Sequence, residues 1–188
     1  PRADPGTGFF YNLLSPQILS MAITKTAGTS VLDFGRANLF SAMGIRDVSW
    51  ESRSGLTIGG YGLHLTTRDI AKLGYLYLKG GVWDDKQIVS RDWIAESTRT
   101  QIETGYFWRH LRGYGYYWYT HAFDGHPAYI AFGLGGQCLV VIPDLDLITV
   151  ITTDDEEAVR GEQYLYILDR TIVPSIKDKP SAGFRASR

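Results

Sequence analysis

The sequence predicts an α+β fold, because its helical and strand-like patterns lie in separate parts of the chain. Helical spacing of apolar residues prevails up to residue 98, strand-like segments follow between residues 113 and 153, and one more helical pattern comes after them. Elements segregated in this way are typical of an antiparallel sheet packed by helices, whereas alternating strands and helices indicate a parallel sheet. The apolar fraction of 44% in 188 residues is sufficient for a packed core.

Four segments of the first half combine a helical apolar period with residues that favour helix ends. Ser15 is the expected N-cap of the first helix, and Gly28 is its expected end. Thr66 and Asp69 have the spacing of a capping box before the third helix, which we expect to end at Gly80. The predicted helices span residues 15–27, 30–43, 67–79 and 90–98.

The second half has short runs of β-branched and aromatic residues bounded by turn residues, which favours strands. Pro143 and Asp146 enclose a turn between two apolar runs and predict a β-hairpin. We expect a final helix at residues 157–173, so that residues 1–173 form one domain and residues 174–188 a loose tail. The predicted strand segments span residues 113–121, 128–133, 136–142 and 147–153, and residues 46–60 are predicted to be mainly loop.

The composition argues against several classes of partner. A net charge of -1 and a pI near 6.5 give no basis for nucleic-acid binding. No run approaches the ~20 apolar residues of a membrane-spanning helix, so no membrane span is expected. Cys138 is the single cysteine and is expected to be a small buried hydrophobe. His121, Asp124 and His126 follow no known metal-ligand spacing, so no metal site is expected.

Tyr11 and Asn12 stand immediately before the first predicted helix. A phenol at this place can shuttle a proton or donate a hydrogen bond, or it can be a half-buried aromatic at a loop–helix junction. The stretch YGYYWY at residues 114–119 is expected to pack mainly in the core, with one or two rings lining an apolar substrate pocket. The rings considered there are Tyr114, Tyr116, Tyr117 and Trp118.

Three glycines, Gly133, Gly135 and Gly136, open one of the predicted strands. Glycine weakens a strand, so three of them indicate that some group comes close to the backbone. An extended ligand could pair there with an edge strand, or a backbone N–H could serve an oxyanion hole. A structural interpretation is equally open, in which the glycines permit a bulge or close helix packing.

Four stretches occur in the order of one family: FFYN at 9–12, GGYGLHLTTRDIAKLGYLYLKGGVWDDKQIVSRDWI at 59–94, YGYYW at 114–118 and AFGLGGQCLVVIPDLDLITVITT at 131–153. With them the chain resembles the later part of the serine β-lactamase-related hydrolases, over residues 8–173. That family includes class C-like β-lactamases, low-molecular-weight penicillin-binding proteins and 6-aminohexanoate-dimer hydrolase. The long second stretch and the last one are the specific parts of the resemblance.

The resemblance implies a β-lactamase/transpeptidase-like fold and a serine that cleaves an amide or ester through an acyl-enzyme, without a cofactor. Tyr11 matches the tyrosine of the family's second motif, and its implied role is a proton relay. The run from Leu134 to Gly136 matches the third motif, whose strand edges the substrate cleft. The residues implied in substrate contact are Asn12, Leu134, Gly135, Gly136 and Gln137.

The sequence departs from the family pattern in its nucleophile, because no serine has a lysine three residues later. We therefore expect the N-terminal part with Ser-x-x-Lys to be missing, to be supplied by a preceding segment or a second chain, and this chain alone to be inactive. Without those helices, the sheet is expected to expose an apolar face that favours an oligomer or a swapped assembly. The family also makes a periplasmic or extracellular location plausible.

Two further departures concern the substrate. Leu134 stands where many members carry a lysine or histidine, which argues against recognition of a carboxylate and against β-lactam turnover. Asn12 adjoins Tyr11, while the position two residues after the tyrosine is Leu13. The alternative to a hydrolase is a non-catalytic relative that keeps the fold and binds a ligand.

Overall fold

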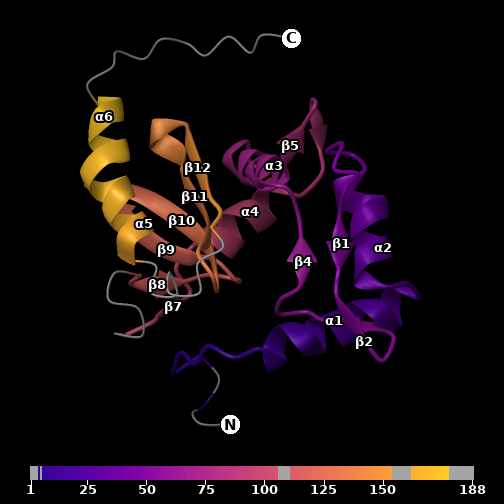
Figure 1. Cartoon of the computed structure of the whole chain (residues 1–188). Helices are drawn as coiled ribbons and strands as arrows, with labels where there is room; N and C mark the ends of the chain where they lie inside the picture. Colours follow the sequence, from indigo (N-terminus) through magenta and orange to yellow (C-terminus); the bar gives the residue numbers. More distant parts are fainter. Residues whose placement is uncertain (1–3, 5, 106–110, 154–161, 178–188) are drawn as a thin grey trace.

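The computed structural model describes residue 4 and residues 6–105, 111–153 and 162–177. Its centre is an antiparallel sheet with helices on both faces, and a smaller part built of helices and short hairpins lies beside it (Figure 1). The α+β fold predicted from the sequence is therefore confirmed.

Six strands form the sheet in the order β12-β11-β10-β9-β8-β7, so each strand pairs with its neighbour in sequence. Asp146, with φ 47°, ends the turn between β11 and β12, which confirms the predicted hairpin. The segment predicted as one strand at 113–121 is instead two strands and a turn. The strands are β7 (Ile102–Glu103), β8 (Gly113–Tyr114), β9 (Tyr119–Phe123), β10 (His126–Gly133), β11 (Gln137–Ile142) and β12 (Leu147–Ile151).

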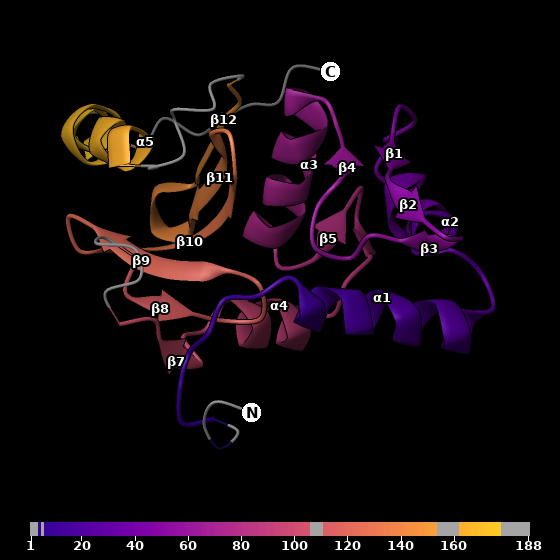
Figure 2. The same cartoon turned by 60° about the horizontal axis from the view of Figure 1, so that its bottom comes forward.

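The side chains of β11 alternate between two apolar layers, as the two-residue period of a strand requires. Cys138 and Val140 face the C-terminal helical segment, residues 162–177, whereas Leu139 and Val141 face helix α3 (Thr67–Leu78). The two helical layers lie on opposite sides of the sheet (Figures 1 and 2). Burial raises the pKa of the Cys138 thiol to about 12, so it remains a protonated, apolar side chain as predicted.

Because both faces of the sheet are covered, the prediction that the sheet exposes an apolar face is wrong. Several exposed apolar side chains lie instead on helix α1 (Leu14–Ala27), which runs along one side of the molecule (Figure 2). Its exposed apolar side chains are Leu14, Ile18, Leu19 and Met21.

The other predicted helices are present, with small shifts at their ends. Thr66 caps α3 by accepting the backbone N–H of Asp69, as its spacing predicts. Gly28 ends α1 with φ 67°. The helices besides α1 and α3 are α2 (Val31–Gly35), continued by the π-helical stretch η1 (Arg36–Phe40), and α4 (Arg91–Thr98).

A second core joins α3 to η1 and the short hairpins. Its fully buried members include Phe40, Met43 and Leu76. Residues 46–60, predicted as mainly loop, carry three two-residue strands. The short strands are β1 (Ser49–Trp50), β2 (Ser52–Arg53), β3 (Leu56–Thr57), β4 (Leu63–His64), β5 (Val82–Trp83) and β6 (Lys86–Gln87).

The C-terminal helical segment comprises α5 (Glu162–Ile167), the π-helical stretch η4 (Leu168–Ile172) and α6 (Val173–Lys177). It continues four residues past the predicted helix end at Val173, through Pro174. Proline lacks the N–H that a helix interior uses, but Pro174 is the second residue of α6 and lies just after η4, where the hydrogen-bond pattern is already shifted. Residues 157–161 of the predicted helix and 178–188 of the predicted tail lie outside the described residues. Within the described parts, no helix has the length and apolarity needed to cross a membrane.

Candidate active site

Tyr11 and Asn12 lie where the chain turns into α1, and Asn12 makes that turn. Its Oδ1 atom accepts the backbone N–H groups of Leu14, at 3.0 Å, and of Ser15, at 2.9 Å. This is the contact of an N-cap, so Asn12 takes the capping role predicted for Ser15, and the helix begins earlier. Its Nδ2 donates to the Phe10 carbonyl at 3.2 Å. These bonds fix the backbone on both sides of Tyr11.

The ring of Tyr11 rests against the sheet while part of it stays in contact with solvent. It is 40% exposed and stacks on Tyr119 of β9, with 6.5 Å between ring centroids and 20° between planes. Tyr119 in turn meets Tyr114 of β8 edge-on at 4.8 Å, and Phe9 packs on Tyr114 at 5.0 Å. Four rings therefore tie the segment before α1 to the end of the sheet.

The phenols of Tyr114 and Tyr11 differ in how far they are buried. Burial, with smaller contributions from the neighbouring phenols of Tyr119 and Tyr11, raises the pKa of Tyr114 far above its usual value. Tyr114 therefore stays protonated at neutral pH and cannot act as a base. Tyr11, which is 40% exposed, is the most exposed phenol of this stack.

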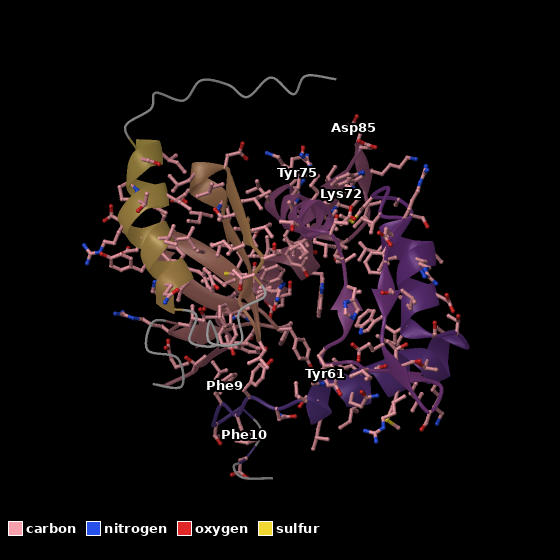
Figure 3. The ribbon with its side chains drawn as sticks, in the orientation of Figure 1. Phe9, Phe10, Tyr61, Lys72, Tyr75 and Asp85 are labelled. Carbon is pink, nitrogen blue, oxygen red and sulfur yellow. The ribbon has the colours of Figure 1, made fainter. Side chains whose placement is uncertain are left out.

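A cavity of about 380 Å³ opens beside Tyr11. It is bounded by residues 8–12, the start of α1, Gly59–Gly60, and the turn between β8 and β9. Phe9 and Phe10, labelled in Figure 3, belong to the segment that leads into α1, and Tyr61 lies close to the start of that helix. Among the described residues, none that lines this cavity carries a charged side chain.

The glycine loop at one wall is docked on α1. Gln17 accepts the backbone N–H of Gly59 at 3.0 Å, and Ser20 donates to the Thr57 carbonyl at 2.6 Å. A Cβ atom at Gly59 would collide with the Pro16 carbonyl, so this close approach requires glycine. The Gly-Gly pair in the sequence was a usable signal for a close contact, but it did not say which helix makes it.

The predicted third motif forms the turn between β10 and β11. Gly133 pairs with Gln137 across it, Leu134 is 78% exposed at its tip, and both Gly135 and Gly136 have positive φ, at 79° and 84°. Positive φ is strained for a residue with a side chain, so the turn itself requires glycine at both positions.

Contacts from the following strand and helix hold this turn from behind. Thr153 donates to the Gly135 carbonyl at 2.9 Å, and the Gln137 side chain donates to the Thr153 carbonyl at 3.1 Å. A Cβ atom at Gly136 would collide with the hydroxyls of Thr153 and Tyr164. The groups that approach Gly136 closely therefore belong to the protein itself.

Strand order rules out one of the interpretations of these glycines. β11 lies between β10 and β12, so the glycine-rich strand is not an edge strand, and an extended ligand cannot pair with it by adding to the sheet. The edges of the six-stranded sheet are β7 and β12.

Register relates the glycine turn to Tyr11. Tyr119, on which Tyr11 stacks, pairs with Ile130, and Gly133 lies three residues, or about 10 Å, further along β10. Tyr11 and the turn therefore lie at the same end of the sheet. The cavity brings Tyr11 and Asn12 together, whereas the described residues around it do not include Leu134, Gly135, Gly136 or Gln137.

Tyr116 and Tyr117, two of the rings considered for a pocket, line the cavity, but from the turn between β8 and β9 and not from the predicted strand. They are 43% and 48% exposed, whereas Trp118 and Tyr119 are buried. Strand periodicity would have buried one of the two, and only the turn at Gly115 exposes both.

Two larger cavities, of about 530 and 510 Å³, lie over β9 and contain none of the predicted site residues. His126, considered as a metal ligand, pairs instead with Asp144, with 2.6 Å between Nδ1 and Oδ2. Across the parts of the chain that the structure describes, no three His, Cys, Asp or Glu side chains are grouped so that they could hold a metal ion.

Comparison with known proteins gives one family match. The sequence model of the family described as Beta-lactamase matches residues 1–172. No curated protein matches the chain.

Several solved structures share the fold. A protein named as a 6-aminohexanoate-dimer hydrolase from Bacillus anthracis is 22% identical, with a TM-score of 0.74, over 88% of this chain and 45% of its own. An octameric penicillin-binding protein homologue from Pyrococcus abyssi is 18% identical, with a TM-score of 0.75, over 91% of this chain and 44% of its own. A beta-lactamase from Mycobacterium bovis is 16% identical, with a TM-score of 0.69, over 89% and 66%. The chain thus spans less than half of the first two structures and about two thirds of the third. At these identities the likeness shows the fold alone, and it confirms the fold expected from the resemblance.

Proposed function

Because the chain belongs to the beta-lactamase family and has its hydrolase fold, we propose that it is the tyrosine-bearing part of a serine hydrolase that cleaves an amide or ester through an acyl-enzyme. The observation that carries this proposal is the position of Tyr11. Its ring is held by Tyr119, and its phenol side lies at a cavity beside the start of α1. A tyrosine fixed in this way can pass a proton at the reacting bond without leaving its place.

The reaction has two steps. The serine hydroxyl adds to the substrate carbonyl while a lysine amine takes its proton, and the bond to the leaving nitrogen or oxygen then breaks as that atom receives a proton through Tyr11. Water next attacks the acyl-enzyme ester, which releases the acid and restores the serine. Tyr11 therefore acts at the leaving group, where proton transfer by a positioned side chain contributes about 10²- to 10⁴-fold to the rate.

The serine and the lysine come from a polypeptide segment that this sequence does not contain. The absence of any serine with a lysine three residues later supports this part of the proposal. The length of the similar structures, of which the chain spans 44–66%, leaves room for such a segment. The exposed apolar side chains of α1 offer it a surface to pack on, because soluble proteins rarely leave several such side chains uncovered on one helix. The penicillin-binding protein homologue of similar fold is described as octameric, which supports association of this chain with a further polypeptide.

A fluorophosphonate probe tests the proposal on protein purified natively from its source. The nucleophilic serine displaces fluoride from phosphorus, so the adduct marks the polypeptide that carries the serine. We expect the adduct on a second polypeptide that co-purifies with this 21.0 kDa chain, or on a longer product that contains both parts. In that assembly, Tyr11→Phe should lower kcat for a simple ester by about 10²- to 10⁴-fold.

The matched control is Tyr61→Phe, because Tyr61 is a 56% exposed phenol that does not line the cavity. It should leave kcat unchanged. Full activity in Tyr11→Phe would remove Tyr11 from the mechanism. A native preparation that contains only this chain, with no adduct, would contradict catalysis.

The second candidate is a ligand-binding relative without turnover, which the absence of Ser-x-x-Lys favours. It differs from the hydrolase in a measurable way, because such a protein binds its ligand but never forms the probe adduct.

A further inference from the structure

As far as the described residues form it, the wall of the 380 Å³ cavity is aromatic and uncharged. Among these residues the polar groups are phenol hydroxyls, Asn12, Ser15 and backbone atoms, and Asn12 is already engaged with α1. A carboxylate transferred into such a place without a cation loses its hydration and gains no ion pair, which is unfavourable. A flat uncharged ring loses little hydration and gains contact with the aromatic faces. The rings of the wall are Phe9, Phe10, Tyr11, Tyr114, Tyr116 and Tyr117.

Tyr117 stands out in this wall because its backbone is strained. Its φ is 66°, in the left-handed region that glycine and asparagine tolerate and bulky residues rarely adopt. It is one of the two central residues of the turn between β8 and β9, which is closed by the bond from the Gly115 N–H to the Trp118 carbonyl at 2.7 Å. Strain of this kind persists only where the surrounding structure imposes it, and it concentrates at functional sites. Burial of the ring does not impose it here, because Tyr117 is 48% exposed.

The neighbours of Tyr117 hold the turn in place. Tyr116 stacks on Trp93 of α4, with 5.5 Å between centroids and 22° between planes, and its N–H donates to the Ser97 carbonyl at 2.8 Å. A Cβ atom at Gly115 would collide with the same Ser97 carbonyl, so the turn sits directly against α4. The ring of Tyr117 is therefore presented at the cavity by a turn that is fixed before any ligand arrives, which reduces the entropy lost on binding.

We propose that this cavity selects uncharged amides or esters that carry an aromatic ring, and that Tyr117 is the residue that determines this specificity by packing its ring against that of the substrate. The inference rests on the proposed function, since it names the substrate class of the same site. It also gives a reason for the tyrosine at a position where glycine would be less strained.

Binding of three matched probes tests the inference without requiring turnover. The first probe, N-benzyl-phenylacetamide, is uncharged and aromatic. The second is its derivative with a carboxylate at the para position of the benzyl ring, which adds a negative charge. The third, N-hexylhexanamide, is uncharged and aliphatic. Titration calorimetry with the full chain, or with the assembly that contains it, gives each Kd. We expect the aromatic amide to bind at least tenfold more tightly than either of the other two.

Two variants at Tyr117 and one control separate the ring from the backbone. Tyr117→Gly relieves the strain and should raise the Kd of the aromatic amide about tenfold without lowering Tm. Tyr117→Asn, which also tolerates positive φ, should do the same and covers the case in which the glycine variant folds poorly. The control is Asp124→Gly in the turn between β9 and β10, where φ is 47° and the residue is exposed, and it should leave the Kd unchanged.

Equal affinity for the three probes, no measurable binding of the aromatic amide, or an unchanged Kd in both Tyr117 variants would each overturn the inference. Failure of the proposed function has a different signature. In that case the aromatic amide binds and the Tyr117 variants weaken it, but no polypeptide forms the fluorophosphonate adduct.

Discussion

Within the stretch YGYYWY, residues 114–119, two neighbouring pairs of aromatic residues differ in their surroundings. Trp118, directly before β9, and Tyr119, its first residue, are 8% and 4% exposed. Tyr116 and Tyr117, in the preceding turn, are 43% and 48% exposed and line the cavity. An aromatic ring packs into the core where a strand fixes its direction, and it becomes available to a ligand where a turn releases it from the sheet.

The buried pair also includes the contact between the sheet and α3. Trp118 packs on Tyr77 of α3 at 4.6 Å and meets Tyr129 of β10 edge-on at 5.3 Å. These contacts lie one residue away from Tyr117, so substitutions in this stretch can separate packing from ligand contact at neighbouring positions.

Trp118→Ala has the largest expected effect. Removing a buried tryptophan leaves a cavity between α3 and the sheet, and we expect the free energy of unfolding to fall by about 3–5 kcal/mol. Tyr116→Ala is the matched change in the turn, and it should cost no more than about 1.5 kcal/mol, the value of its stacking on Trp93. Urea denaturation followed by circular dichroism measures both. Equal losses would show that the turn is as much a part of the core as the strand.

Gly136→Ala extends the comparison to the other predicted site segment. The alanine would need a left-handed backbone, at about 1–2 kcal/mol, and would press its methyl group on Thr153 and Tyr164, at about 1–3 kcal/mol more. Gly125→Ala separates these contributions, because φ there is 85° and no atom lies within 4 Å of the added methyl. We expect Gly136→Ala to be the more destabilising of the two by urea denaturation. Equal effects would mean that Thr153 and Tyr164 move aside, and that space beside Gly136 is open to a ligand.

Most of the fold could be predicted from the sequence, because its signals are local. The cap at Thr66, the stop at Gly28 and the apolar periods of α3 and of β11 depend only on neighbouring residues, and each lies where it was expected. The turn within 113–121 was missed because β propensity runs through Tyr116 and Tyr117 without interruption. Only the packing of Gly115 against Ser97, eighteen residues earlier in the chain, places a turn there.

The site was less predictable, because it depends on contacts between distant segments. The pairing of Tyr11 with Tyr119 joins residues more than a hundred positions apart, and no pattern near Tyr11 indicates it. Glycine also gives the same sequence signal for different causes. Gly136 lies against side chains of the protein itself, and Gly59 lies against the backbone of α1. A motif therefore indicated where close contacts occur, but not whether a ligand makes them.

Substitution of Asn12 has the smallest expected effect on stability. Asn12 both lines the cavity and caps α1, so its variants can separate a role in packing from a role in the site. Asn12→Ala should lower the free energy of unfolding by about 1 kcal/mol, the usual cost of a lost N-cap. Asn12→Asp keeps the acceptor oxygen and adds a negative charge at the helix start, so stability should be retained. If Asn12 also binds substrate through its amide N–H, Asn12→Asp will lose kcat/KM in the active assembly at unchanged stability. If its activity equals that of the parent protein, Asn12 belongs to the packing half of the comparison, and Tyr11 is the one residue of the predicted second motif that faces the chemistry.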